Sequence, residues 1–236
     1  IKTAGRSLDS IALHAKQLRQ GLASIILLAV MSACGSKQVI VQGSFPSPIM
    51  EPLPLTLGVL YPDAFTSHEF FDEASGPAEI DWRVNTGAAQ VQFWDTLFDG
   101  MFERVVHIRN HDDLHQGDDS IDAVIIPSVA DLQYTVPTHT NIKIYEIWMR
   151  YRFRLVALDA IHDHDNGDLT YNPANSFADW QLSAYGKTPT AFMQSDEAAV
   201  NLAAVMALRD AGAHFITSFG RVPEITQWLD SREGLQ

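Results

Sequence analysis

A long alternation of apolar and polar side chains constrains the fold of this 236-residue chain more than any other feature. From Tyr145 to Leu155 every odd position is apolar, and the even positions between them are Glu146, Trp148, Arg150, Arg152 and Arg154. Successive side chains of a strand point to opposite faces of the sheet, at about 3.3 Å per residue. The stretch from Lys143 to Ala157 therefore predicts one long strand of an antiparallel sheet, with one buried face and one solvent face.

Shorter segments predict the other strands of this sheet. Pro127 lies within one of them and predicts a bulge or an edge there, because proline cannot donate a ladder hydrogen bond. Apolar residues share one parity or form short runs at residues 55–61, 105–108, 122–136 and 177–185.

Two longer segments predict helices. Apolar residues recur at spacings of three and four from Thr86 to Glu103, and a second run follows the N-cap residue Ser195. Pro223 is suited to the first turn of a further short helix. The element order predicts an α+β fold, a single domain in which two main helices pack on one face of an antiparallel sheet.

The only cysteine, Cys34, ends the apolar stretch L-A-S-I-I-L-L-A-V-M-S-A-C. A membrane-spanning helix needs about 20 apolar residues, and this stretch is shorter and interrupted by Ser24 and Ser32. Basic residues before an apolar core, with small residues after it, are typical of a secretory signal. Residues 30–34, V-M-S-A-C, resemble the lipobox of bacterial lipoproteins. The alternative is a hydrophobic helix of a globular domain with a buried free cysteine.

The lipobox resemblance implies cleavage before Cys34, a diacylglyceryl group on its thiol, and an acyl group such as palmitate on the new amino terminus. In such lipoproteins an Asp after the cysteine favours the inner membrane, so Gly35 implies the periplasmic face of the outer membrane. The resulting organisation is a signal peptide over residues 1–33, with its true start left open because the chain begins with Ile1. The lipidated cysteine and a tether follow over residues 34–54, with four prolines from Pro46 onward, and the α+β domain occupies residues 55–236.

Composition excludes one class of partner. The formal net charge is −13, and removing residues 1–33 makes it more negative. Nucleic-acid phosphates require a basic surface, so we expect no nucleic acid. With Cys34 lipidated, no thiol remains for a disulfide or a cysteine metal site.

Arg150, Arg152 and Arg154 form a row on the predicted solvent face of the long strand. Each guanidinium can donate two parallel hydrogen bonds to a carboxylate or a phosphate. The row is therefore a candidate contact for an acidic partner or an anionic lipid. The alternative is that Asp and Glu side chains on neighbouring strands neutralise it.

Two loops mix His with Asp, at residues 111–119 and 162–168, and they supply the candidate metal ligands His111, His115, His162 and His164. The second loop does not fit a calcium-binding loop, because His162 and His164 occupy positions that require carboxylates. Asn166-Gly167 predicts instead a tight hairpin turn between the long strand and its return partner. We therefore expect no metal and no cofactor apart from the covalent lipid.

Catalytic sequence motifs are missing: the chain has no G-x-S-x-G, H-E-x-x-H, phosphate-binding loop or G-x-G-x-x-G. The lipobox, tether and element order resemble small envelope lipoproteins, such as the auxiliary lipoproteins of lipid-transporting ABC systems and the lipoprotein of the lipopolysaccharide export barrel. The resemblance implies a non-enzymatic scaffold or auxiliary subunit bound to an outer-membrane or periplasmic complex. The alternative is a periplasmic metal- or ligand-binding module, or a hydrolase, that uses the His/Asp loops.

Overall fold

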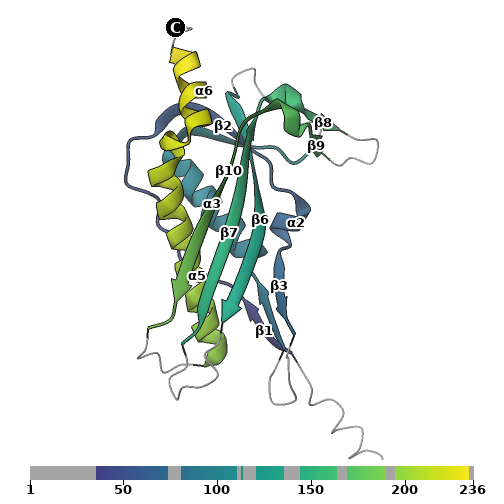
Figure 1. The fold of residues 1–236 in the computed structure, drawn as a ribbon, viewed down its shortest axis with the longest axis vertical. Helices are drawn as coiled ribbons and strands as arrows, with labels where there is room; N and C mark the ends of the chain where they lie inside the picture. The colour runs from purple at the N-terminus through teal and green to yellow at the C-terminus, as the bar shows by residue number, and fades with distance from the viewer. Residues whose placement is uncertain are drawn as a thin grey trace, which may run out of the picture. The chain divides into compact units, whose positions relative to one another are not determined.

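The computed structural model describes residues 36–73, 81–110, 113, 121–135, 144–163, 169–189 and 195–233. The chain divides into two compact units, residues 1–37 with 73–81 and residues 38–72 with 82–236. In the first unit the N–H of Lys37 donates to the carbonyl of Asp81 at 2.8 Å. The description that follows concerns the second unit, whose helices and strands are labelled in Figure 1.

A five-stranded sheet forms the framework, in the order β10-β7-β6-β2-β5. Its strands are β2 (Leu53–Val59), β5 (Phe102–His107), β6 (Ala123–Thr135), β7 (Glu146–Val156) and β10 (Ser176–Lys187). β7 pairs antiparallel with both β6 and β10, as the alternation predicts. The α+β class is confirmed. β2, however, runs parallel to both β5 and β6, so the sheet is mixed.

The parallel pairs arise from the connection between β2 and β5. Parallel neighbours need a crossover, which is usually a helix, and here α3 (Gly87–Met101) precedes β5 directly. An apolar run such as residues 55–61 does not by itself specify the direction of its neighbours.

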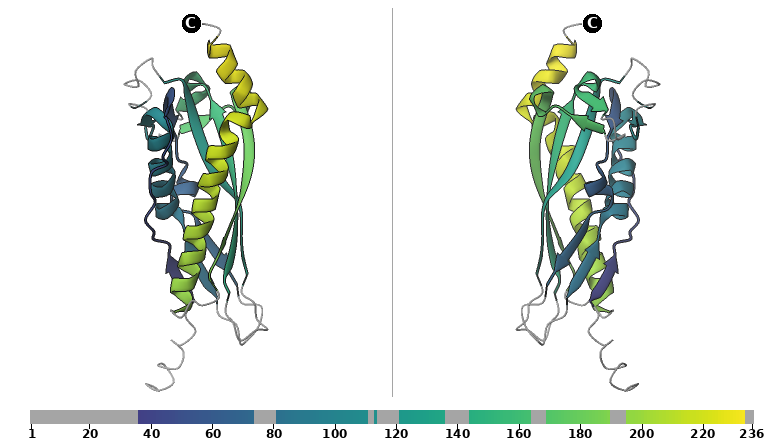
Figure 2. Two further views of the ribbon diagram at one scale, coloured as in Figure 1. Left: turned by 90° about the vertical axis from the view of Figure 1, so that its left-hand side faces the viewer. Right: turned by 90° about the vertical axis from the view of Figure 1, so that its right-hand side faces the viewer.

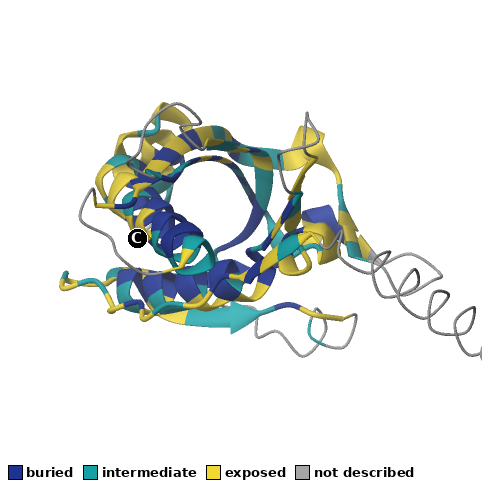
Figure 3. Ribbon diagram, turned by 90° about the horizontal axis from the view of Figure 1, so that it is seen from below, coloured by how far each residue is buried: buried dark blue, intermediate teal, exposed yellow. Residues whose placement is uncertain are grey.

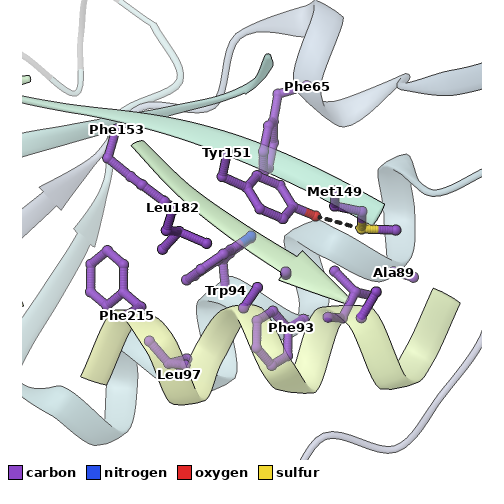
Figure 4. Close-up of a cluster of buried hydrophobic side chains, with 14 of the residues drawn as sticks. Phe65, Ala89, Phe93, Trp94, Leu97, Met149, Tyr151, Phe153, Leu182 and Phe215 are labelled. Atoms are coloured by element: carbon purple, nitrogen blue, oxygen red, sulfur yellow. Dashed lines mark hydrogen bonds between the residues drawn. The ribbon is translucent and has the colours of Figure 1, made fainter. Parts of the chain in front are cut away.

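The two main helices, α3 and α5 (Asp196–Ser218), pack on the same face of the sheet, as predicted (Figure 2). Trp94 of α3 lies between them and the sheet, with its ring centroid 4.9 Å from Phe153 of β7 and 5.3 Å from Phe215 of α5. Figure 4 shows these rings together in the core. A short 3₁₀ turn (Phe219–Arg221) leads into α6 (Pro223–Glu233). Viewed along the helices, buried residues face inward from both helices and from the long strands (Figure 3).

Small residues bring α5 close to β10. A Cβ placed on Gly186 would lie 1.9 Å from the carbonyl oxygen of Ala203 and 2.4 Å from the backbone nitrogen of Ala207. Only a residue without a side chain fits that space. The helix backbone therefore lies directly against the strand backbone at this point.

One buried polar group links three elements. Gln90 of α3 is fully buried, and its Nε2 donates to the carbonyl of Phe65 in α2 (Asp63–Thr66) at 2.5 Å. The hydroxyl of Tyr151 in β7 donates to Gln90 Oε1 at 3.2 Å. Burial raises the pKa of Tyr151 well above its ordinary value, which keeps the phenol neutral and able to donate.

Strand β6 contains the predicted irregularity. A bulge leaves Ala130 unpaired between Val129 and Asp131 in the register with β7. The pairs between β6 and β2 extend only from Ala123 to Ile125, so Pro127 lies just beyond them. Proline is tolerated there because that side of β6 has no ladder partner in β2.

A second, smaller core covers the opposite face at one end of the sheet. It contains apolar residues of β6 and β7, of the residues that follow β2 and β5, and of the segment between β7 and β10: Leu60, Ile108, Val124, Ile126, Val156, Ala160 and Ile161. That segment forms a short antiparallel ribbon, β8 (Ile161–Asp163) and β9 (Leu169–Tyr171). The predicted turn at Asn166-Gly167 lies outside the described residues. The prediction of a single hairpin between the long strands is wrong, because β8 and β9 lie between β7 and β10 in the sequence.

The segment expected to be a tether also differs from the prediction. β1 (Lys37–Ile40) belongs to a second sheet with β4 (Trp82–Asn85) and β3 (Glu69–Asp72), and Val39, Val41 and Phe45 are buried. The backbone of Gln42 exchanges hydrogen bonds with the side chain of Asn201 in α5, at 2.8 and 3.1 Å. Extended backbone can pair and pack, so the folded part begins well before Leu55.

Candidate functional site: the outer face of the long strands

The outer face is the surface of β6, β7 and β10 that points away from α3 and α5. It carries the even-numbered side chains of β7, and the strand register sets their neighbours. Arg154 lies opposite Asp179 of β10, Arg150 lies opposite Ser183 of β10 and Asp131 of β6, and Trp148 lies opposite Tyr185 of β10 and Gln133 of β6.

Asp179 binds two members of the arginine row. Nε and Nη2 of Arg152 donate to its two carboxylate oxygens at 2.6 Å each, and Nε of Arg154 donates to Oδ2 at 3.0 Å. These hydrogen bonds lower the pKa of Asp179 below its ordinary value, and those from Arg152 have the larger effect. Arg154 also donates to the hydroxyl of Tyr171 and lies over that ring, 5.4 Å from the centroid. Neutralisation by a neighbouring strand therefore holds for Arg152 and Arg154.

Arg150 differs from the other two arginines. It is exposed, and its guanidinium makes no hydrogen bond or ion pair with any residue in the described ranges. The facing carboxylate of Asp131 instead accepts a hydrogen bond from Gln133 Nε2 at 2.9 Å. Arg150 borders a shallow depression of about 320 Å³ that also involves Asp131, Gln133, Trp148 and Ser183.

Next to Arg150 is an exposed aromatic pair. The rings of Trp148 and Tyr185 have centroids 4.9 Å apart, and the two residues are 40% and 37% exposed. The Tyr185 hydroxyl donates to Glu146 Oε1 at 2.7 Å, and Lys187 Nζ lies 3.3 Å from the same oxygen. Desolvation and the Glu146 carboxylate raise the pKa of Tyr185 to about 12. Both rings are thus fixed in place although they face solvent.

Strand β10 forms one edge of the sheet, and α5 covers part of that edge with side chains. The N–H of Tyr185 donates to Asp210 Oδ2 at 2.9 Å, and His214 Nδ1 lies 2.8 Å from the carbonyl oxygen of Ser183. These bonds satisfy backbone groups that would otherwise be open to another strand. A binding partner would therefore contact the side chains of the outer face more readily than the backbone of this edge.

Of the other predicted site residues, the structure describes His162. Cys34, His111, His115 and His164 lie outside the described residues. His162 is exposed on β8, and within the described ranges no three His, Cys, Asp or Glu side chains are grouped so as to hold a metal ion.

Comparison with known proteins gives a fold but no family. The sequence matches no protein-family model and is not similar to any curated protein. A crystal structure of a Xanthomonas campestris protein of the family model DUF330 matches with a TM-score of 0.50 and 12% identity, over 84% of this chain and 99% of that one. The likeness is one of fold alone.

Two further structures match less closely. A homolog of the neuraminyllactose-binding hemagglutinin from Helicobacter pylori has a TM-score of 0.40 and 9% identity, over 84% of this chain and 100% of that one. A hypothetical protein from Chlamydia trachomatis has a TM-score of 0.37 and 12% identity, over 72% and 99%. At these TM-scores neither match bears on the function of this chain.

The arginine row was visible in the sequence, whereas the aromatic pair was not. The position of Trp148 within the alternation places it on the solvent face. Its contact with Tyr185 depends on the register between β7 and β10, two strands that the β8–β9 ribbon separates in the sequence. Chain spacing between the two strands does not reveal that register.

Proposed function

We propose that the protein is a lipid-anchored envelope lipoprotein that acts as a non-catalytic scaffold or auxiliary subunit and binds a protein partner through its outer face. The observation that carries this proposal is the exposed pair of Trp148 and Tyr185 beside Arg150. Tryptophan, tyrosine and arginine are enriched among the residues that supply most of the binding energy at protein interfaces. Here all three lie on a sheet, which holds them in a fixed arrangement.

The location belongs to the same proposal. The lipobox at Cys34 supports a covalent lipid anchor, and Gly35 supports the periplasmic face of the outer membrane. None of the helices in the described part of the chain is long and apolar enough to cross a membrane. The fold shared with the DUF330 protein is compatible with this role, and the anchor would bring the outer face to a partner at the membrane.

Two ion pairs on the outer face limit which arginines the proposed partner could bind. Arg152 and Arg154 already bind Asp179, so a partner would have to displace Asp179 to use them. Arg150 is the member of the row available for a carboxylate of the partner. The aromatic pair supplies the apolar area next to it.

The test is a pull-down from detergent-solubilised envelopes, with mass spectrometry of the captured proteins and lipids. The bait carries Trp148→Ser with Arg150→Gln, and Met206→Ser is the matched control because Met206 is an exposed apolar residue of α5. We expect the outer-face variant to lose one specific protein and the control to retain it. Circular dichroism checks that both variants remain folded.

Two results would contradict the proposal. An unchanged set of captured proteins would remove the outer face as an interface. Loss of a lipid with no loss of a protein would replace the protein partner by an anionic headgroup at Arg150.

A further inference from the structure

A cleft of about 990 Å³ opens at the end of β2 and β5, and Tyr171, the residue that contacts Arg154, forms part of its wall. β2 ends at Val59 and β5 ends at His107, and the two strands are paired at these positions. The carboxyl ends of parallel strands are a frequent position for ligand clefts. The volume falls within the range of small-molecule sites, which is roughly 300 to 1,000 Å³.

Apolar side chains form most of the cleft walls. They come from β2, α3, β5, β6 and β9, and include Val59, Leu60, Val91, Ile108, Ile126 and Leu169. The ring of Tyr61 also borders the cleft and stacks on Phe65 of α2, with centroids 5.4 Å apart and planes at 3°. Such walls can accept the hydrocarbon part of a ligand.

The carboxylate of Asp95 lies among the polar side chains of the cleft and already has one hydrogen-bond donor. The Tyr61 hydroxyl donates to Asp95 Oδ1 at 2.7 Å, and His107 Nε2 lies 3.7 Å from the same oxygen, beyond hydrogen-bond distance. Burial and the neighbouring Asp95 raise the pKa of Tyr61, so its phenol stays a neutral donor. A carboxylate has about four acceptor positions. Within the described ranges Tyr61 is its hydrogen-bond donor, and the side chain of Asp95 is still 32% exposed.

We propose that this cleft binds a small amphipathic organic cation, whose ammonium group binds Asp95 and whose hydrocarbon part lies against the apolar walls. The proposal does not depend on the outer face or on the lipid anchor. The site residues are Asp95, Tyr61, Val91 and Ile108.

The charges around the cleft favour a cation over an anion. Asp63 lies in the wall together with Asp95. The basic side chains in the wall are His107 and Arg109, and Arg109 is exposed. The chain as a whole carries a net charge of −13, which attracts cations. The walls favour an organic cation, because apolar side chains do not coordinate metal ions.

Three probes that share one hydrocarbon part test the proposal: hexylamine, hexanol and hexanoate. Each is titrated into the folded protein, and saturable binding is measured by ligand-observed NMR. We expect hexylamine to bind about tenfold more tightly than hexanol, because its ammonium gains a charged hydrogen bond. Hexanoate should bind most weakly.

Two variants and one control locate the site. Asp95→Asn keeps an oxygen that can accept from Tyr61 and removes the charge, so it should abolish the preference for hexylamine. Val91→Phe fills the cleft and should weaken all three probes. Asp99→Asn removes an exposed charge one helical turn from Asp95 and should retain the preference.

The proposal is overturned by equal binding of hexylamine and hexanol, by tighter binding of hexanoate, or by a preference for hexylamine that survives Asp95→Asn. Thermal unfolding of each variant shows whether it is folded. A folded Val91→Phe variant that binds hexylamine as tightly as the wild type would also overturn it, because binding would then lie elsewhere.

Discussion

Asp179 balances the charge of two arginines on the outer face. Its pKa is lowered in the folded state, so the unfolded chain takes up a proton at higher pH than the folded chain does. The stability that this carboxylate contributes is therefore present above the ordinary Asp pKa of about 4. It is lost as the pH falls through the lower folded value.

Replacing Asp179 should reduce this acid sensitivity. We expect Asp179→Asn to be less stable than the wild type at neutral pH, because Arg152 and Arg154 lose their shared counter-ion, and to lose less stability on acidification. Urea unfolding on both sides of about pH 4 measures the difference. Asp159→Asn is the control, since Asp159 is exposed and forms no ion pair with the described residues. An acid response identical to that of the wild type would contradict the role of Asp179.

Gln90 is the buried polar residue on which the contact of α2, α3 and β7 depends. Gln90→Leu leaves the Phe65 carbonyl without its side-chain donor and the Tyr151 hydroxyl with only the weak acceptor Met149 Sδ, which should cost about 1–3 kcal/mol of unfolding free energy. Adding Tyr151→Phe should recover part of that loss, because one unsatisfied group disappears. Gln92→Leu, on the exposed side of α3, should change the free energy by no more than about 0.5 kcal/mol. Equal effects at the two positions would contradict the role of the buried network.

At the scale of single elements, α5 protects the edge strand β10. Asp210→Ala with His214→Ala removes the side chains that bind the N–H of Tyr185 and the carbonyl of Ser183. We expect the variant to stay folded but to self-associate as its concentration rises, because an open strand edge can pair with another chain. Light scattering against concentration measures this, with Met206→Ala on the same helix as the control. A monodisperse double variant would show that other features protect the edge.

Two glycines give a matched pair of substitutions. Gly186→Ala should destabilise the protein by about 1–3 kcal/mol, because the new methyl group meets the backbone of Ala203 and Ala207. Gly220→Ala should be neutral or stabilising by about 0.4–1 kcal/mol, since a Cβ there meets nothing within 4 Å. Denaturant unfolding of both variants measures the difference. A mild effect at Gly186 would mean that α5 can shift away from β10 at little cost.

The same elements show which parts of the fold were predictable. β7 and α3 have a strong internal period, and α5 begins with a capping serine whose oxygen accepts from the N–H of Ala198, so local sequence specified all three. The strand β1 was missed because its neighbouring prolines also fit an unpaired tether. The parallel direction of β2 and the contact of Trp148 with Tyr185 depend on partners distant in sequence, which no local pattern encodes.

For the candidate sites, residue type was more predictable than pairing. The arginine row was identified, but its partner Asp179 lies 25 and 27 residues from Arg154 and Arg152, on another strand. Tyr61, Asp95 and His107 form a cluster only because β2, α3 and β5 converge at one end of the sheet. Their order in the sequence matches no motif, so the cleft could not be predicted from the sequence.

At the scale of the whole molecule, we propose that the location depends on Cys34. We expect the wild type to incorporate labelled palmitate and to fractionate with membranes, and Cys34→Ala to do neither. Membrane association of an unlabelled Cys34→Ala protein would mean that another surface holds it there.

The early start of β1 then limits how far this protein can reach. The strand begins at Lys37, three residues after Cys34. Even fully extended, three residues span only about 10 Å. A lipid on Cys34 would therefore be joined to this strand by a very short linker and would hold the start of the strand within about 10 Å of the lipidated residue. We therefore expect a partner that is itself at the membrane surface, where the short connection would keep the local concentration high.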